Sequence, residues 1–310
     1  MSVPTMNPPA PSSVKRYWTA TRPYSFTAAA VPVLIGSLLA VAVGSASFSI
    51  VAFALTLIGA VAIQSVANVV NDLYDRRTGI DREDNYGRFN SFVAEVVTES
   101  EGKRIIGFAS AVALAIAIWF ILRVGAPAVS LIVMGALLAF FYTAPPFRLK
   151  HYALGDAAVA AGFGFGMLYG AFLAQLPATT PWQTLIIYTL PSLLLVVGIL
   201  HANNHRDRVA DLGLNARTVA NLLSERGSAW LNSAYLLLPY ALVIVGVATK
   251  LATPFWLLTL LSFPIALKLH QRGQRGDVEG MYVPEVAKLH GLFGILTAVA
   301  IGVSLLFHKG

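Results

Sequence analysis

Nine long apolar stretches limit what this chain can fold into more than any other feature. Each runs for about 17–25 residues, the length that an α-helix needs to cross roughly 30 Å of hydrocarbon at about 1.5 Å per residue. We place them at residues 23–44, 48–72, 104–123, 126–143, 152–174, 182–203, 229–249, 254–270 and 288–307. Because they are continuously apolar and do not alternate, they indicate helices and not a β-barrel. The sequence therefore predicts an all-α polytopic membrane protein.

The composition agrees with this class and excludes others. Only 12% of the 310 residues are charged, about half the share that is typical of a soluble domain. The absence of cysteine excludes disulfides, thiolate metal sites and cysteine nucleophiles. Residues 1–14 are rich in Pro and Ser and predict a disordered tail, which leaves residues 15–310 as a single transmembrane domain.

Lysine and arginine are concentrated in alternate loops. All but three of the 22 lie in the N-terminal segment or after the even-numbered stretches, the exceptions being Arg123, Lys250 and Lys309. Basic loops stay in the cytoplasm, so we expect a cytoplasmic N-terminus and a multi-pass protein of the plasma (inner) membrane. This placement also explains the net charge of +7 without a nucleic-acid partner. All 15 acidic residues fall on the same side, which predicts a site on the cytoplasmic face.

Acidic residues cluster where the second stretch ends. Asp72 and Asp75 share a helix face with Asn68, because residues three and four apart are neighbours on a helix. Gly79 predicts the end of this helix and lets Asp81 fold back toward the same face.

A matching cluster stands where the sixth stretch ends. Asn203, Asp207 and Asp211 recur every four residues and again share a face. Carboxylates repel one another and are opposed by the negative end of the helix dipole. Two interpretations remain open for each cluster. Neighbouring arginines can neutralise it as a solvated helix end, or the carboxylates can bind Mg²⁺ together with substrate phosphate oxygens.

Two loops on the same side predict a cap over these clusters. They span residues about 73–103 and 204–228, and both are charged yet contain apolar runs. The first resumes a helix through Thr98 and Glu101, which is a capping-box pattern. Such segments can close over a site, and the alternative is a short helix on the lipid headgroups.

A third loop contributes positive charge. Pro145 and Pro146 predict that the fourth helix stops and that an extended segment follows. Arg148 and Lys150 alternate along this segment and can face one anion, although ordinary positive-inside charge would also explain them.

Carboxylates, cations and a large apolar interior together fit the chemistry of a polyprenyl diphosphate. Mg²⁺ and cationic side chains can stabilise the departing diphosphate, and a water-poor pocket protects the allylic cation until an aromatic acceptor attacks. We therefore expect Mg²⁺ as cofactor, and a polyprenyl diphosphate, an aromatic acceptor and the lipid bilayer as partners, with no oligomeric state predicted.

The two clusters also resemble the aspartate-rich motifs of the UbiA family of intramembrane prenyltransferases. The resemblance covers nearly the whole chain and implies a nine-helix prenyltransferase bundle. It is carried by Asn71-Asp72-x-x-Asp75, Asn203-Asn204-x-Arg206-Asp207-x-x-x-Asp211, Arg22-Pro23, Tyr142-Thr-x-Pro145-Pro146, Leu154-Gly155-Asp156 and Lys288-Leu-His290. The paired asparagines resemble most the branch that prenylates 1,4-dihydroxy-2-naphthoate in menaquinone (quinone) biosynthesis, with release of CO₂ and diphosphate.

The resemblance implies a role for each matching residue. Mg²⁺ bridged to diphosphate would be bound by Asp72, Asp75, Asp207 and Asp211, assisted by Asn68, Asn203 and Asp81. Diphosphate oxygens would be held by Arg88, Arg148, Lys150 and Arg206. Tyr142 would lie near the allylic cation, where an aromatic face stabilises positive charge. Substrate contacts would come from Asn203, Asn204 and Arg22, although Arg22 could instead anchor the first helix at the interface.

One departure from the branch concerns the acceptor. The branch often shows Gly-Lys-x-Thr after the second motif, whereas this chain has Ala216 in place of the lysine and Arg217 beside it. Other acceptors therefore stay open, including 4-hydroxybenzoate, homogentisate, haem and a lipid. A transporter with an acidic inner vestibule is a more remote alternative, because the middles of the stretches lack ionisable residues.

Overall fold

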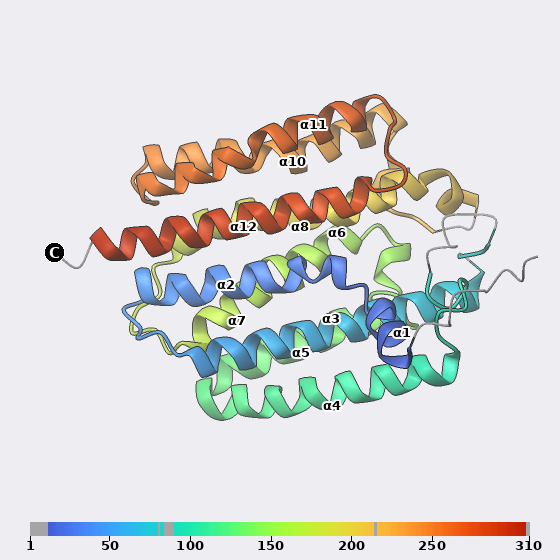
Figure 1. Cartoon of the computed structure of the whole chain (residues 1–310), viewed down its shortest axis with the longest axis horizontal. Coiled ribbons are helices and arrows are strands. Elements are labelled where there is room, and N and C mark those ends of the chain that lie inside the picture. The colour runs from blue at the N-terminus through green and yellow to red at the C-terminus, as the bar shows by residue number, and fades with distance from the viewer. Residues whose placement is uncertain (1–11, 80, 84–89, 214–215, 308–310) are drawn as a thin grey trace, which may run out of the picture.

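The chain folds into a bundle of long helices that lie side by side. The computed structural model describes residues 12–79, 81–83, 90–213 and 216–307. Within these ranges the secondary structure is helical, and the only β-type pairing is an isolated bridge between Tyr152 and Arg217. Figure 1 shows the long helices running along the longest axis of the molecule. The predicted all-α class is confirmed.

In chain order, the helices are α1 (Ser13–Ala20), η1 (Pro23–Ser25), α2 (Thr27–Ala42), α3 (Ile50–Thr78), α4 (Glu99–Val124), α5 (Ala126–Phe141), η3 (Leu149–His151), α6 (Gly155–Val159), η4 (Ala160–Gly166), α7 (Met167–Ala174), α8 (Trp182–Gly213), α9 (Val219–Leu222), α10 (Glu225–Ala248), η5 (Pro254–Ser262), α11 (Phe263–Gln274) and α12 (Tyr282–Phe307). Segment η4 is a π-helical turn that joins α6 to α7, whereas η1, η3 and η5 are 3₁₀-helical.

Seven helical segments among the described residues are long and apolar enough to cross a membrane. They are Pro23–Ala42, Ile50–Thr78, Glu99–Val124, Gly155–Ala174, Trp182–Val209, Glu225–Ala248 and Tyr282–Phe307. The two remaining predicted spans are helical but differ from this pattern, because α5 has 16 residues and the stretch 254–270 is divided between η5 and α11. The structure thus supports a multi-pass membrane protein, while the count of nine spans and the cytoplasmic N-terminus stay predictions.

The ends of α3 and α4 follow the predicted capping signals. Helix α3 stops at Gly79, whose positive φ of 73° is readily adopted only by glycine. Helix α4 begins with a complete capping box, in which Thr98 and Glu101 satisfy each other's backbone N–H groups. Helices α3 and α8 continue beyond their apolar stretches to Thr78 and Gly213. Both acidic clusters therefore lie on helices.

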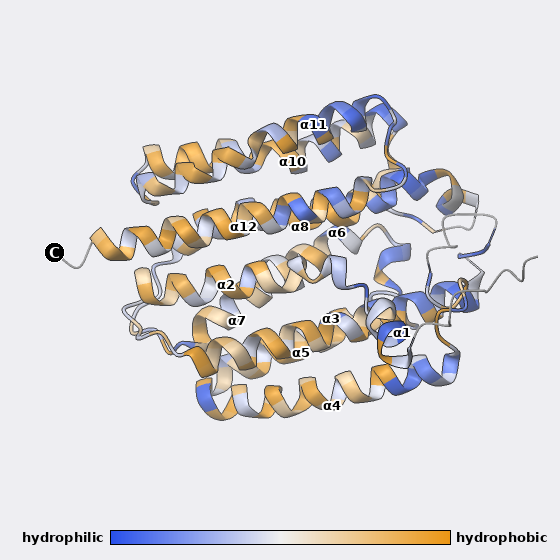
Figure 2. Cartoon of the chain, in the orientation of Figure 1, coloured by the Kyte–Doolittle hydropathy of each residue, from blue (hydrophilic) through white to orange (hydrophobic). Residues whose placement is uncertain are grey.

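Hydrophilic residues gather at one end of the bundle, which we call the polar end. Figure 2 shows them at the end of α3, the end of α8, the start of α4 and the end of α11, all remote from the C-terminus. The helices that carry the two acidic clusters thus end in the same region of the molecule (Figure 1).

The segment after α5 is not extended, so that prediction was wrong. Arg148 has a left-handed backbone with φ of 45°, and the chain reverses there into the 3₁₀ turn η3. The backbone N–H of Lys150 donates to the carbonyl of Tyr142 at 3.0 Å, which folds the segment back onto the end of α5. The two prolines restrict only themselves and the residue before each of them, so they do not determine the backbone from Arg148 onward.

Candidate active site

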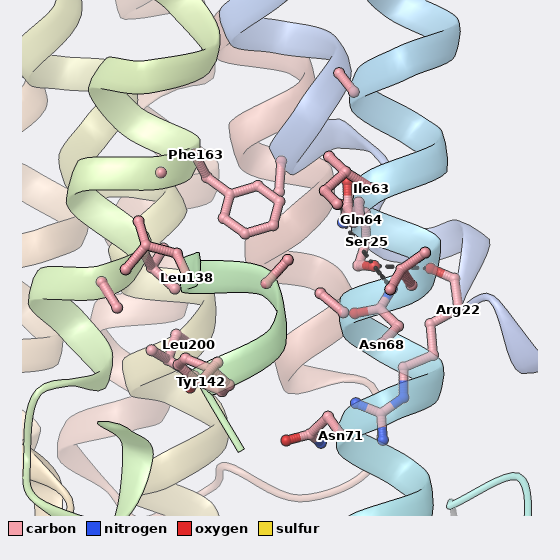
Figure 3. Close-up of a pocket in the computed structure, with 18 of the residues that line it drawn as sticks. Arg22, Ser25, Ile63, Gln64, Asn68, Asn71, Leu138, Tyr142, Phe163 and Leu200 are labelled. Atoms are coloured by element: carbon pink, nitrogen blue, oxygen red, sulfur yellow. Dashed lines mark hydrogen bonds between the residues drawn. The ribbon is translucent and has the colours of Figure 1, made fainter. Parts of the chain in front are cut away.

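A cavity of about 1060 Å³ runs from the polar end into the bundle. Helices α2, α3, α4, α5, α7 and α8 and the start of α12 supply its walls. Figure 3 shows Leu138, Tyr142 and Leu200 on one side of this space and Gln64 and Asn68 on the other. The polar lining at its mouth includes Arg22, Asn68, Asn71, Asp75, Asp81, Lys150, Asn203, Asn204, Arg206, Asp207 and Asp211. Residues of both acidic clusters therefore open onto one cavity.

Asp72 is the innermost carboxylate of the first cluster. It has no exposed surface and forms an ion pair with the guanidinium of Arg22, which follows α1 in a left-handed backbone conformation. Its other oxygen accepts a hydrogen bond from the backbone N–H of Ser91 at 3.0 Å. The amide of Asn90 donates both to the backbone carbonyl of Asp72 and to the carboxylate of Asp81. Asp72 thus fastens the segment after α1 and the loop before α4 to the end of α3.

Asp75, one turn further along α3, forms an ion pair with a different basic side chain, Lys150. The ammonium of Lys150 lies 2.6 Å from both carboxylate oxygens of Asp75 and 3.2 Å from the amide oxygen of Asn71. Thr143 donates to the same Asn71 oxygen at 2.8 Å. The folded-back segment after α5 thereby delivers Lys150 to the mouth of the cavity. Asp75 and Lys150 both line it.

The second cluster is held together on α8 itself. Two guanidinium nitrogens of Arg206 donate to the two carboxylate oxygens of Asp207, at 2.7 and 2.8 Å. The second of these nitrogens also donates to the amide oxygen of Asn203 at 2.9 Å, and the Asn203 amide donates back to Asp207 at 3.2 Å. The predicted face of Asn203, Asp207 and Asp211 is therefore present, with Arg206 laid across it.

Asp211 differs from Asp72, Asp75 and Asp207 because no ion pair involving it occurs among the described residues. It lies beyond the membrane-spanning part of α8 and lines the cavity. Burial raises the pKa of Asp211 from 3.8 to about 7, opposed by the positive charge of Lys150 and reinforced by the negative charges of Asp207, Asp75 and Asp81. Because Asp75 and Asp81 belong to the first cluster, the two clusters are close enough to repel each other electrostatically.

The donor set fits a hard divalent cation. Asp75, Asp81, Asp207 and Asp211 supply carboxylate oxygens around one mouth, and such oxygens are the ligands that Mg²⁺ prefers. In the described part of the chain, no three acidic or histidine side chains approach closely enough to form a finished metal site. Instead, the ammonium of Lys150 and the guanidinium of Arg206 stand against Asp75 and Asp207. Positive charge therefore already occupies the places where a metal would be bound.

The remaining predicted residues fall in different places. Tyr142 and Asn204 line the cavity. Asn68 also lines it, but its amide donates to the Thr21 carbonyl at 2.8 Å and to the Ser25 hydroxyl at 3.1 Å, so it holds the connection between α1 and α2. Arg148 is exposed and is not among the described residues that line the cavity. Arg88 lies outside the described residues.

Several polar residues at the mouth were not predicted. Gln64 lies one helical turn before Asn68 and binds Ser25 through its amide, as Figure 3 shows. Its position on the face of Asn68 and Asp72 was a usable signal. Asn90 and Ser91 gave no such signal, because only the folded loop brings them to Asp72.

The comparisons with known proteins agree with this geometry. The model of the UbiA prenyltransferase family matches residues 29–279. The chain belongs to the UbiA prenyltransferase family. A relative from Drosophila melanogaster, the UbiA prenyltransferase domain-containing protein 1 homolog, is 31% identical over 294 residues, which cover 93% of this chain and 79% of that one. The 1,4-dihydroxy-2-naphthoate octaprenyltransferase of Bacillus subtilis is 24% identical over 254 residues, covering 80% and 78%.

Solved structures share the fold of this UbiA-family chain. A UbiA homolog from Aeropyrum pernix superposes with a TM-score of 0.69 at 18% identity, covering 90% of this chain and 98% of that one. A UbiA homolog from Archaeoglobus fulgidus bound to geranyl diphosphate and Mg²⁺ gives a TM-score of 0.62 at 14% identity, covering 93% and 99%. The chain is a prenyltransferase of this family, and the use of Mg²⁺ with a prenyl diphosphate is consistent with it.

Proposed function

We propose that this chain transfers a polyprenyl group from polyprenyl diphosphate to a hydroxylated aromatic ring, with 1,4-dihydroxy-2-naphthoate as the first candidate acceptor and demethylmenaquinol, CO₂ and diphosphate as products. One observation carries the proposal: two acidic helix ends, with Lys150 and Arg206 between them, open onto a single deep apolar cavity. The cavity lies at the upper end of the range of about 300–1,000 Å³ that is usual for ligand pockets, as a substrate with an apolar tail requires.

Each end of the cavity suits one part of such a substrate. Asp75, Asp207 and Asp211 would hold the metal, and Lys150 and Arg206 would bind diphosphate oxygens once they leave their carboxylates. When bound, Mg²⁺ would neutralise the negative charge that develops on the departing diphosphate. The apolar walls exclude water from the allylic carbon, and the ring of Tyr142 lies on the lining where its face can stabilise positive charge.

Two positions on the cavity lining, Arg22 and Ala216, give a specific reason to consider a second type of acceptor ring. Arg22 lines the cavity but pairs with Asp72, so it would have to leave Asp72 to contact an acceptor carboxylate. Ala216 lines the cavity where the naphthoate branch often has lysine, whereas Arg217 is exposed and lies outside the lining as described. A hydroxylated ring without a carboxylate is therefore the second candidate acceptor.

We place the reaction at the cytoplasmic face of the plasma membrane. The support is the distribution of lysine and arginine, which are concentrated in the loops on the side of the polar end. Diphosphate would enter from water at this end, and the prenyl tail would lie among the helices.

Mass spectrometry of the products tests the proposal. Membranes that contain the protein are offered geranylgeranyl diphosphate, Mg²⁺ and a mixture of 1,4-dihydroxy-2-naphthoate, 1,4-naphthohydroquinone and 4-hydroxybenzoate. A prenylated naphthol derived from either bicyclic ring supports the proposal, and isotopic labelling of one ring identifies the acceptor. Prenylated 4-hydroxybenzoate alone would overturn the choice of acceptor.

Two variants make this experiment specific to the site. Asp207→Asn should abolish Mg²⁺-dependent product, because it removes a cavity carboxylate. Asp277→Asn is the matched control, since Asp277 is an exposed acid paired with Arg272 away from the cavity. Equal activity in both variants would refute the assignment of the second acidic cluster.

A further inference from the structure

Two side-chain amides on one face of α3 are held by the segment that precedes α2. Gln64 and Asn68, which we call the amide pair, both donate to the hydroxyl oxygen of Ser25, at 3.0 and 3.1 Å. Ser25 donates to neither of them, because its single hydroxyl proton is bound to the Arg22 carbonyl at 2.8 Å. The amides of Gln64 and Asn68 also donate to the backbone carbonyls of Ser25 and Thr21, at 2.7 and 2.8 Å respectively. Both amide nitrogens therefore face this segment (Figure 3).

The same contacts determine where the amide oxygens lie. An amide turned the other way would set its oxygen against a carbonyl oxygen, so the nitrogens stay toward the carbonyls and the oxygens are turned away from them. Gln64 is only 3% exposed, and its oxygen has no hydrogen-bond partner in the part of the chain that the structure describes. The Asn68 side chain likewise acts only as a donor among these residues. Because buried acceptors are almost always paired, the open oxygen of Gln64, with that of Asn68 beside it, indicates a ligand that donates.

The amide pair belongs to the wall of the cavity. Gln64 and Asn68 both line it, and side chains four residues apart on a helix are neighbours at about 5–6 Å. Asn68 precedes Asp75 by two turns of α3, which places it about 10 Å deeper than the carboxylate at the mouth. The adjacent lining residues of α3, Ile63 and Ala67, are apolar. A donor bound to the amide pair would thus lie beyond the diphosphate, where the apolar part of the cavity begins.

An aromatic side chain faces the amide pair from across the cavity. Figure 3 shows Phe163 on the side opposite Gln64 and Asn68, with its ring extending toward them. Phe163 lines the cavity and belongs to the π-helical turn η4. Such turns are rare and occur frequently at functional sites. A flat ring in this space can pack against Phe163 while groups on its edge meet the amide oxygens.

We infer that the amide pair recognises the acceptor ring by accepting one hydrogen bond from each of two hydroxyls on opposite carbons of that ring. The inference rests on the proposed function, because it assumes an aromatic acceptor beside a prenyl chain whose diphosphate lies at the mouth. The two hydroxyl oxygens are separated by about the same distance as side chains four residues apart on a helix, so one ring can reach both amides. Both 1,4-dihydroxy-2-naphthoate and 1,4-naphthohydroquinone carry such hydroxyls. In 4-hydroxybenzoate a carboxylate replaces one of them, and a carboxylate cannot donate to an amide oxygen.

Binding of two ring compounds tests this inference without turnover. The purified protein is loaded with Mg²⁺ and geranylgeranyl thiolodiphosphate, an analogue whose leaving group departs too slowly to react, and is titrated calorimetrically with a reductant present. The Kd of 1,4-naphthohydroquinone should be at least about tenfold lower than that of 4-methoxy-1-naphthol, which lacks one donor and leaves one amide oxygen unpaired. In Gln64→Met the two Kd values should agree within about threefold, because only Asn68 is left to accept. The Kd of 4-methoxy-1-naphthol itself should change by less than about threefold.

Gln175→Met is the matched control for this substitution. Gln175 is also 3% exposed, and its amide pairs with the backbone of Ser49 in both directions, at 2.7 and 3.2 Å. It is not among the described residues that line the cavity. This variant loses a buried glutamine as Gln64→Met does, so it should keep the wild-type preference for the hydroquinone. Thermal unfolding shows whether each variant is folded, and Asn68→Leu tests the other amide in the same way if Gln64→Met does not fold.

The possible failures can be told apart. If Gln64→Met keeps the wild-type preference, or weakens both ring compounds equally, the amide pair only fastens α3 to the segment before α2 and the inference is wrong. A wild-type protein that binds the two compounds equally well would also overturn it. If the prenyl analogue itself does not bind in the presence of Mg²⁺, the proposed function is overturned, and the inference with it.

Discussion

Replacing Asp72 by asparagine tests how the polar end is assembled. The Asp72 side chain has no exposed surface, and that of its partner Arg22 is 25% exposed. Asparagine preserves the volume and one acceptor oxygen but removes the nearest counter-charge of the guanidinium and leaves only the more distant Asp75 and Asp81. Removing one partner of a buried ion pair costs about 3–5 kcal/mol, because the other charge stays buried and uncompensated. We therefore expect Asp72→Asn to lower the free energy of unfolding by about this amount.

A second ion pair at the same end provides the matched control. Glu99 accepts from Arg77 at 2.6 Å, but the two side chains are 37% and 42% exposed. Exposed pairs contribute about 0–1 kcal/mol, because water screens them and both side chains lose rotational freedom. Glu99→Gln changes the net charge as Asp72→Asn does, so the difference between the two variants isolates the effect of burial.

The assay is unfolding by heat and by denaturant in one detergent, followed by tryptophan fluorescence. A double variant, Arg22→Met with Asp72→Asn, removes both charges, keeps an acceptor for the backbone N–H of Ser91 and should recover most of the stability that Asp72→Asn alone loses. The reasoning is refuted if Asp72→Asn is no less stable than Glu99→Gln, or if the double variant is as unstable as Asp72→Asn. Neither readout depends on catalysis, so loss of activity cannot imitate the effect.

Three further outcomes follow from the site and the packing. Lys150→Met should raise the Kd for a prenyl diphosphate by about 10–100-fold, which corresponds to the loss of one hydrogen bond to a charged group. The same variant should bind Mg²⁺ alone more tightly, because Asp75 no longer has a competing cation. Calorimetric titrations measure both affinities. Because burial raises the pKa of Asp211 to about 7, protons compete with the metal for this carboxylate below that pH. The affinity for Mg²⁺ should therefore fall as the pH is lowered through 7, and this fall should be less steep in Asp211→Asn. Gly36→Ala should destabilise by about 1–3 kcal/mol, because its Cβ would lie 2.1 Å from a backbone oxygen of α7, whereas Gly107→Ala meets nothing within 4 Å and should not; thermal unfolding compares them.

The sequence was sufficient for those parts of the fold that local chemistry determines. Apolar length located the helices, since crossing hydrocarbon imposes it on each segment separately. The stop at Gly79 and the capping box at Thr98 were predictable because each involves only residues within one turn. The helical spacing of Asp207 and Asp211 placed them on one face for the same reason.

The pairing of charges at the first cluster was not predictable, because it joins residues that are distant in the chain, whereas Arg206 and Asp207 of the second cluster are adjacent in sequence. Arg22 meets Asp72 from 50 positions away, and Lys150 meets Asp75 from 75 positions away. The second contact also depends on the reversal at Arg148, where a tertiary arrangement overrides the extended conformation that the prolines favoured. The cavity was hidden for the same reason, since several helices that are distant in the chain supply its walls.

The charges at the mouth indicate how the metal and the diphosphate depend on each other. Lys150 and Arg206 compensate Asp75 and Asp207 at present. A cation that bound alone would separate Lys150 and Arg206 from their carboxylates, and a diphosphate that bound alone would meet the negative charge of those carboxylates. If both bound, the carboxylates would hold the metal and the displaced Lys150 and Arg206 would hold the diphosphate, so every charge would keep a partner. The binding free energies of the two ligands must then be coupled in both directions, as linkage requires.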